Sequence, residues 1–134
     1  MNLSKSDVRD VMTPSPLTVR PDASLHDALR RMHEGGVSCL VVDCGSGRGW
    51  GMLTHKDAMS LLGAGEVEAA LEGTEVRDVM TAPAVTVPPD YRVGTALDQM
   101  RMLGVRRAPV VEGGRLLGIL SYTDVFRRVL AGLF

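Results

Sequence analysis

One six-residue stretch occurs twice in this chain. Val-Arg-Asp-Val-Met-Thr at residues 8–13 recurs at residues 76–81, and 15 of the 30 positions from 8 to 37 match the residues 68 positions later. Self-similarity at a fixed offset is typical of a structural unit that is repeated along a chain. The sequence therefore predicts a tandem duplication in which both copies adopt the same local structure.

Each copy predicts the same order of elements. After a Pro-Asp turn, apolar side chains recur at the i, i+3, i+4, i+7 spacing of an amphipathic helix. They are Leu25, Ala28, Leu29 and Met32 in the first copy and Val93, Ala96, Leu97 and Met100 in the second. Two short apolar strands joined by a glycine-rich turn then predict a β-hairpin, and a second helix begins at Thr54 or Ser121.

The predicted fold class is α/β (α+β), with the unit strand, helix, strand, strand, helix used twice. The first repeat occupies residues 7–62 and the second residues 76–131, and residues 63–75 form a linker with one or two helical turns. The hairpin strands are expected at 37–42 and 50–53, and again at 107–111 and 116–120. With 134 residues the chain is long enough to bury a core without a disulfide or a metal ion.

The charge balance and the hydropathy pattern exclude several classes of function. Fifteen basic and sixteen acidic residues argue against a dedicated binder of nucleic acid or of anionic membranes. The longest apolar runs have four or five residues, too few to span a bilayer, and the N-terminus lacks the apolar core of a signal peptide. Cys39 and Cys44 are too few for a disulfide framework or a zinc site. We therefore expect a soluble, cytoplasmic protein.

Each predicted second helix begins with a hydroxyl residue that is followed three positions later by an aspartate. The pairs are Thr54 with Asp57 and Ser121 with Asp124. This spacing is typical of a capping box, in which both side chains bond to free backbone N–H groups of the first turn. The same geometry suits a ligand, because a carboxylate accepts hydrogen bonds from two adjacent sugar hydroxyls and a helix N-terminus favours a phosphate. The sequence leaves both interpretations open.

The ordered series of motifs resembles the cystathionine-β-synthase (CBS) domain. The series is Val-Arg-Asp-Val-Met-Thr, Thr-Val with Pro-Asp, Ala-Leu-x-x-Met, Gly-Val, and Gly-hydrophobic-Leu-[Thr/Ser]-x-x-Asp, and it runs twice between residues 7 and 130. Two copies resemble the tandem pair called a Bateman module. The resemblance implies pseudo-twofold packing, a homodimer, and an adenine nucleotide or related adenosyl ligand in the clefts between the copies. It also implies that the last aspartate of each series binds ribose and that the module regulates a partner.

The residues expected around such a ligand come from the first strand, the start of the second strand and the start of the second helix. They are Thr18, Val19, Val37, Ser38, Thr54 and Asp57 in the first copy, and Thr86, Val87, Val105, Arg106, Arg107, Ser121 and Asp124 in the second. Apolar walls with backbone amides suit a flat purine, although strand packing explains the valines as well.

The two copies differ at one of these places. Ser38-Cys39 of the first copy is replaced by Arg106-Arg107 in the second. Guanidinium groups bind phosphate bidentately, unless solvent or acidic side chains already satisfy them. The second site is therefore expected to suit a phosphorylated ligand better than the first.

These observations favour a regulatory module that senses AMP, ADP, ATP or S-adenosylmethionine and modulates a partner. No cofactor is required, His26, His33 and His55 lack the spacing of a metal site, and no nucleophile is paired with a base, which argues against an enzyme. Two alternatives stay open. One is a ligand-free dimerisation or protein-interaction module whose Thr/Ser-x-x-Asp boxes are only caps, and the other is a nucleic-acid-binding regulator that uses its arginines.

A homodimer is expected because small sheet-and-helix halves leave apolar helix faces that one chain does not cover. The residues assigned to these faces are Met32, Met59, Leu62, Met100, Met102 and Leu130.

Overall fold

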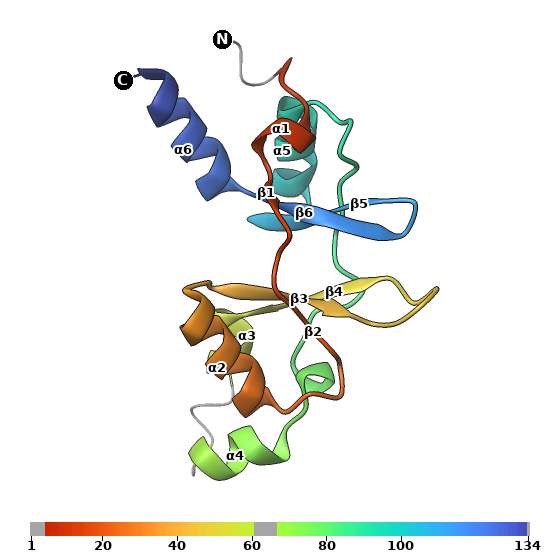
Figure 1. Cartoon of the computed structure of the whole chain (residues 1–134), viewed down its shortest axis with the longest axis vertical. Helices are drawn as coiled ribbons and strands as arrows, with labels where there is room; N and C mark the ends of the chain where they lie inside the picture. Colours follow the sequence, from red (N-terminus) through yellow and green to blue (C-terminus); the bar gives the residue numbers. More distant parts are fainter. Residues whose placement is uncertain (1–4, 61–66, 134) are drawn as a thin grey trace. The chain divides into compact units, whose positions relative to one another are not determined.

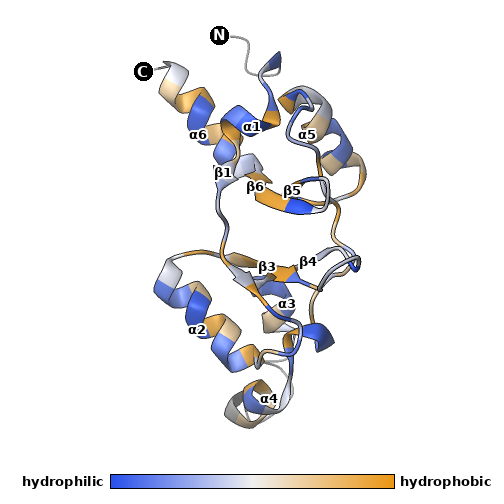
Figure 2. Cartoon of the chain, turned by 45° about the vertical axis from the view of Figure 1, so that its right-hand side comes forward, coloured by the Kyte–Doolittle hydropathy of each residue, from blue (hydrophilic) through white to orange (hydrophobic). Residues whose placement is uncertain are grey.

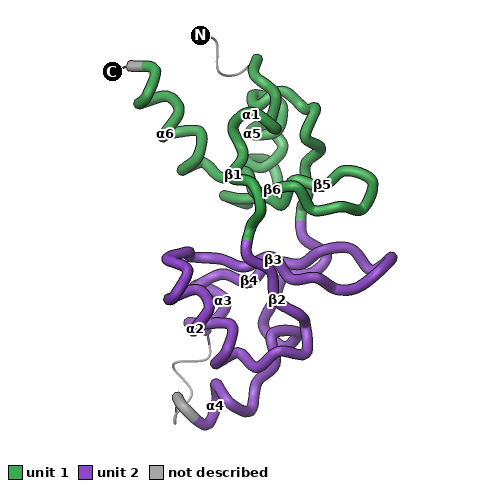
Figure 3. Tube along the Cα trace, in the orientation of Figure 1, with its two compact units in different colours: residues 1–16, 85–134 green, residues 17–84 purple. Residues whose placement is uncertain are grey.

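The computed structural model describes residues 5–60 and 67–133. Its chain divides into two compact units, which Figure 3 distinguishes by colour. Unit 1 combines Met1–Pro16 with Val85–Phe134, and unit 2 is Leu17–Ala84. Helices and one small sheet in each unit confirm the predicted α/β class. None of the described helices is long and apolar enough to cross a membrane.

Unit 2 contains most of the first copy. Its sheet has the order β2-β3-β4, with β2 parallel to β3 and β3 antiparallel to β4. The elements are β2 (Thr18–Val19), α2 (Leu25–Gly35), β3 (Cys39–Asp43), β4 (Trp50–Thr54), α3 (His55–Met59), α4 (Val67–Gly73) and the 3-10 helix η2 (Val76–Asp78) (Figure 1). The short helix α4 confirms the helical turns predicted inside the linker.

Unit 1 repeats this plan with the second copy. Its sheet has the order β1-β6-β5, and both neighbouring pairs are antiparallel. The elements are α1 (Val8–Val11), β1 (Thr13–Pro14), α5 (Val93–Met102), β5 (Arg107–Glu112), β6 (Arg115–Ser121) and α6 (Tyr122–Leu133). The predicted first strand of this copy is reduced to a single parallel bridge between Val87 and Val110.

The segment that opens each copy packs in the unit of the other copy. In unit 1, the Val8 N–H donates to the Tyr91 carbonyl oxygen at 2.8 Å, and the Val93 N–H donates to the Ser6 carbonyl oxygen at 2.8 Å. The corresponding bonds of unit 2 join Val76 to Ala23 at 2.9 Å and Leu25 to Thr74 at 2.8 Å. The compact units therefore differ from the sequence repeats, because the copies exchange their first segments.

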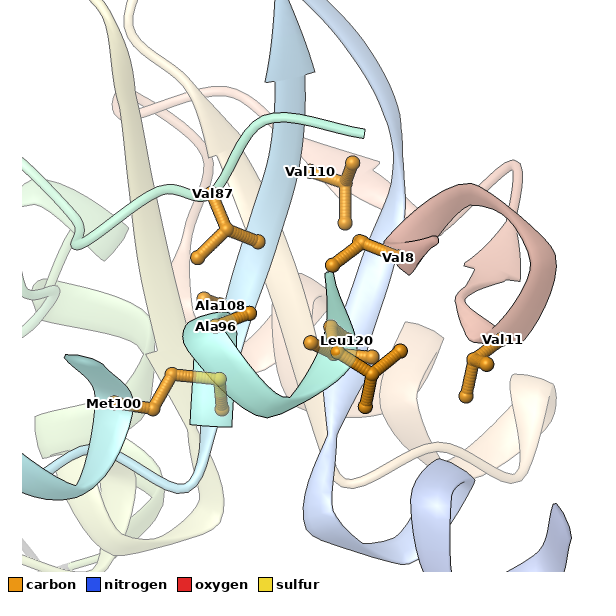
Figure 4. Packing of buried hydrophobic residues seen from close by; sticks show 9 residues of the cluster. Val8, Val11, Val87, Ala96, Met100, Ala108, Val110 and Leu120 are labelled. Atoms are coloured by element: carbon orange, nitrogen blue, oxygen red, sulfur yellow. The ribbon is translucent and has the colours of Figure 1, made fainter. Parts of the chain in front are cut away.

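The exchanged segments also contribute to the two hydrophobic cores. Figure 4 shows Val8 and Val11 of α1 in one cluster with Leu120 of β6 and with Ala96 and Met100 of α5. In unit 2, Val76 of η2 belongs to the core that α2 forms with β3 and β4. Each core is thus built from residues of both sequence copies, and apolar burial holds the exchanged segments in place.

The first copy's second strand begins later than predicted. Gly36 adopts a left-handed conformation with φ 63° and ends α2. The Gly36 N–H bonds to the His33 carbonyl oxygen at 3.2 Å and the Val37 N–H bonds to the Met32 carbonyl oxygen at 3.0 Å, the pattern of a Schellman cap. Val37 therefore belongs to the helix cap, and β3 starts at Cys39.

Two methionines assigned above to an uncovered face lie in the cores instead. Met32 is 1% exposed and Met100 is fully buried. Both occupy the i+7 position of the apolar spacing, so they point to the sheet with the rest of that stripe. Met59, Met102 and Leu130 are exposed as expected, and Leu62 lies outside the described residues.

Strand β1 lies close to β6 at Gly118, which pairs with Pro14. A Cβ atom added at Gly118 would lie 2.6 Å from the Thr13 carbonyl oxygen and 2.7 Å from the Met12 sulfur. The corresponding glycine of unit 2 is Gly51, where an added Cβ would lie 3.1 Å from the Thr81 carbonyl oxygen. Close backbone contact therefore requires glycine at 118 more strictly than at 51.

We expect Gly118→Ala to lower the free energy of unfolding by about 1–3 kcal/mol, because the added methyl group forces β1 away from β6. Gly51→Ala is the matched control and should have the smaller effect, since its neighbours need to move by only a few tenths of an ångström. Urea unfolding of the two variants and the parent chain measures both losses. An equal or larger loss in Gly51→Ala would contradict this account of the β1 contact.

Candidate functional site

The start of α6 forms a closed set of hydrogen bonds around Asp124. The Asp124 N–H donates to the Ser121 hydroxyl oxygen at 3.1 Å, and the Ser121 N–H donates to Asp124 Oδ2 at 3.0 Å. The Ser121 hydroxyl also donates to Asp124 Oδ2 at 2.9 Å. The predicted capping box is therefore present, and it uses one carboxylate oxygen completely.

The other oxygen of Asp124 is bound by a residue far away in the sequence. The Thr13 hydroxyl donates to Asp124 Oδ1 at 2.7 Å. Thr13 lies on β1 opposite Ile119, in the strand that leads directly to Ser121. The sequence did not predict this contact, because Thr13 was counted with the first repeat and only the exchange of segments brings it to the second.

The start of α3 has the same cap with fewer bonds. The Thr54 N–H donates to Asp57 Oδ2 at 2.9 Å, and the Asp57 N–H donates to the Thr54 hydroxyl oxygen at 3.2 Å. Within residues 5–60 and 67–133, neither Asp57 Oδ1 nor the hydroxyl hydrogen of Thr54 has a bonding partner. Thr81, the counterpart of Thr13, bonds to Met52 through its backbone, and its side chain has no hydrogen bond to another described residue. The two caps therefore present different hydrogen-bonding groups.

The start of the first strand of each hairpin brings further predicted residues to these helix starts. The His55 N–H donates to the Ser38 carbonyl oxygen at 3.2 Å, and the Tyr122 N–H donates to the Arg106 carbonyl oxygen at 3.1 Å. Arg107 pairs with Ser121 across the β5–β6 ladder, as Cys39 pairs with Thr54 in unit 2. The structure thus brings Ser38 to the Thr54 cap, and Arg106 and Arg107 to the Ser121 cap.

The charge of the two sites differs as the sequence indicates. Arg106 is exposed and Arg107 is half-buried. Four other arginines, Arg9, Arg20, Arg77 and Arg101, pair with carboxylates at 3.1–3.6 Å. In the part of the chain that the structure describes, no acidic side chain pairs with Arg106 or Arg107. The backbones of both arginines lie at the start of α6, and no carboxylate among the described residues neutralises their charges.

The four predicted first-strand residues differ in burial and in contacts. Val19 is 6% exposed and Val87 is 1% exposed, and both pack in the hydrophobic cores. The N–H and carbonyl groups of Val87 bond to Pro109 and Val111 at 3.0 and 3.1 Å. Thr18 is half-buried and its carbonyl oxygen accepts a hydrogen bond from Arg31, while Thr86 is exposed. Val87 therefore has a packing role in the core of unit 1, and both of its backbone polar groups bond to β5.

Unit 2 also contains an open hollow of about 540 Å³ beside the start of α3. Its lining includes Val37 and Ser38, which the sequence analysis selected, and six residues that it did not. These are Leu29, Met32, His33, Gly36, His55 and Met59. Helical spacing alone could not reveal them, because the hollow forms only where the end of α2 meets the start of α3. Val105, the counterpart of Val37, is half-buried against the core of unit 1.

The described side chains include no candidate metal site. They form no group of three or more histidine, cysteine, aspartate or glutamate residues that could hold an ion. The hydrogen-bond donors and acceptors at the two caps suit a polyhydroxylated or phosphorylated organic ligand better.

Comparisons with known proteins agree with this fold. The arabinose 5-phosphate isomerase of Yersinia pestis is 32% identical over 122 residues, which are 91% of this chain and only 36% of that enzyme. A hexameric CBS-CP12 protein from bloom-forming cyanobacteria superposes with a TM-score of 0.81 at 27% identity, over 90% of this chain and 69% of that one. CBSX2 in complex with AMP superposes with a TM-score of 0.75 at 26% identity, over 93% of this chain and 97% of that one.

The family comparison covers both copies. The family model described as the CBS domain matches residues 8–64 and again residues 76–131. Two matches in one chain agree with the internal repeat and with the paired units of the structure. The chain belongs to the CBS-domain family and contains a tandem pair of these domains.

Proposed function

We propose that this chain is a regulatory module that binds an adenosine-containing ligand, such as AMP, ADP, ATP or S-adenosylmethionine, and modulates a partner. The main support is the similarity to CBSX2, which binds AMP and matches this chain over 97% of its own length. A regulatory role is also consistent with the isomerase relative, because this chain spans about a third of that enzyme's length. The module itself is proposed to have no catalytic activity.

The Asp124 cap is the proposed binding site in unit 1. Asp124 is only half-buried, so its carboxylate can exchange a protein hydrogen bond for one from a ribose hydroxyl. Arg106 and Arg107 flank the same helix start and have no carboxylate partner among the described residues. Together these groups suit a ribose with a phosphate attached.

The Asp57 cap is the proposed binding site in unit 2. There Ser38 stands in place of Arg106, so this site lacks the positive charge that favours a phosphate. Its other carboxylate oxygen, Asp57 Oδ1, has no partner among residues 5–60 and 67–133 and is proposed to accept a hydrogen bond from a sugar hydroxyl. The two sites are therefore proposed to differ in their preference for phosphorylated ligands.

A dimer is proposed as the functional assembly, and α6 provides its surface. Tyr122, Phe126, Val129 and Leu130 fall on one side of this helix and are 37–60% exposed. Figure 2 shows hydrophobic and hydrophilic residues side by side along α6. An apolar stripe of this kind on an amphipathic helix marks an interface more often than a solvated surface. The alternative of a ligand-free dimerisation module would use the same face.

An adenosine compound that binds only the folded chain should raise its melting temperature. At a hundredfold excess over the dissociation constant the stabilisation is about 2.7 kcal/mol, which corresponds to several degrees for a chain of this size. A thermal-shift series with AMP, ADP, ATP and S-adenosylmethionine measures it, with GMP as the control for base recognition. If none of these compounds shifts the transition at about millimolar concentration, the ligand-free module is the correct alternative.

Replacing Arg106 and Arg107 together by alanine should weaken AMP binding about tenfold or more, because hydrogen bonds to a charged phosphate are lost. Adenosine, which has no phosphate, should bind almost as well as it binds the parent chain. The exposed pair Arg127 and Arg128 on α6 provides a control with the same change in net charge. Isothermal titration with both ligands tests this assignment, and equal losses for AMP and adenosine would exclude the arginines as phosphate ligands.

The α6 face should hold a dimer at micromolar protein concentration, and Phe126→Glu should dissociate it because a charge then replaces an aromatic ring that the interface would bury. Arg128→Glu is the control, since residue 128 lies about 200° around the helix from Phe126. Light scattering should give twice the chain mass for the parent and for Arg128→Glu, and the chain mass for Phe126→Glu. A monomeric parent chain would rule out this interface.

A further inference from the structure

The hydrogen-bonding capacity of Asp124 is almost fully used by the protein itself. A carboxylate has about four acceptor positions, two on each oxygen. The Ser121 N–H and hydroxyl groups occupy two positions on Oδ2, and the Thr13 hydroxyl occupies one on Oδ1. With the donors of the described residues counted, one position on Asp124 is left, whereas the two adjacent hydroxyls of a ribose require two.

Of the groups that donate to Asp124, the Thr13 hydroxyl can be displaced with the smallest loss of folding stability. Ser121 is tied to Asp124 by three hydrogen bonds that also start α6, so its release would unravel the helix cap. Thr13 makes a single side-chain bond, its residue is exposed, and water can replace its hydroxyl group. The backbone pairing of β1 with β6 does not depend on this hydroxyl.

Unit 2 provides a natural comparison. Thr81 pairs with Met52 through two backbone bonds of 2.9 Å, in the position where Thr13 pairs with Ile119. Among the described residues, however, no side-chain bond joins Thr81 to Asp57. Thr13 and Thr81 thus occupy equivalent positions, and of the two only Thr13 bonds to a cap carboxylate among the described residues.

We propose that Thr13 is a specificity-determining residue that competes with a ribose hydroxyl for Asp124 Oδ1. This inference rests on the proposed function, since it concerns the same site. In the free protein the Thr13 hydroxyl holds the acceptor position, and a nucleoside must displace it to form two hydrogen bonds. Thr13 of β1 therefore lowers the affinity of this site for ribose. Ligand binding is linked to β1 because the ligand must break the hydrogen bond between Thr13 and Asp124.

The test substitutes Thr13→Val, which keeps the shape and the β-branched side chain but removes the hydroxyl group. Adenosine affinity, measured by isothermal titration, should rise about three- to tenfold, the range expected when one competing hydrogen bond is lost. Thr81→Val is the matched control and should leave the affinity unchanged. The gain should vanish for 2′,3′-dideoxyadenosine, which lacks both sugar hydroxyls, and in an Asp124→Asn background.

The outcomes separate this inference from the proposed function. Adenosine binding that weakens or stays the same in Thr13→Val overturns the competition and would make Thr13 a residue that orients Asp124 or has no role. A gain that persists with 2′,3′-dideoxyadenosine also overturns it, because the effect would then not involve ribose. If no adenosine compound binds the parent chain or Thr13→Val, both proposals fail together. A gain in adenosine affinity in Thr13→Val that is absent in Thr81→Val supports both proposals.

Discussion

The exchange of the first segment between the two copies is the constraint on which the rest of the structure depends. The Val8–Tyr91 and Val76–Ala23 backbone bonds fix these segments beside α5 and α2. Because Val8 and Val76 are fully buried, each exchanged segment completes a hydrophobic core that the other copy begins. The same placement carries Thr13 to Asp124 and so defines the chemistry of one helix start. The sheet, the core and the candidate site of unit 1 all follow from it.

The capping box and the candidate binding site are made of the same atoms. A cap needs only one carboxylate oxygen to bond to the backbone, so the second oxygen is available for another donor. In unit 2 that oxygen has no partner among the described residues, and in unit 1 it has a threonine. Stability and recognition therefore do not compete at these helix starts, provided that a ligand uses Oδ1 and leaves Oδ2 to the helix.

Much of the local structure could be predicted because it is encoded by nearby residues. The apolar spacing from Leu25 to Met32, the glycine-rich turns and the Thr54 and Ser121 caps correspond to α2, the hairpins and the starts of α3 and α6. The exchange could not be predicted, since residues 8–13 and 76–81 are identical and fit either copy. For the same reason the Thr13 contact was missed. The sequence allows Met32 in a core stripe or on an open face, and only the packing decides between these two positions.

The exchange has a consequence for how the duplicated halves diverge. When two copies fold separately, a change in one is compensated within that copy, and the halves drift independently. Here the neighbours of Val8 are encoded more than eighty positions downstream, as Tyr91 illustrates, while the neighbours of Val76 lie in the first half. Compensating substitutions should thus be found across the midpoint of the gene. We therefore expect the two halves to evolve together. If one half were transferred alone into another protein, its hydrophobic core would lack the residues that the other half contributes.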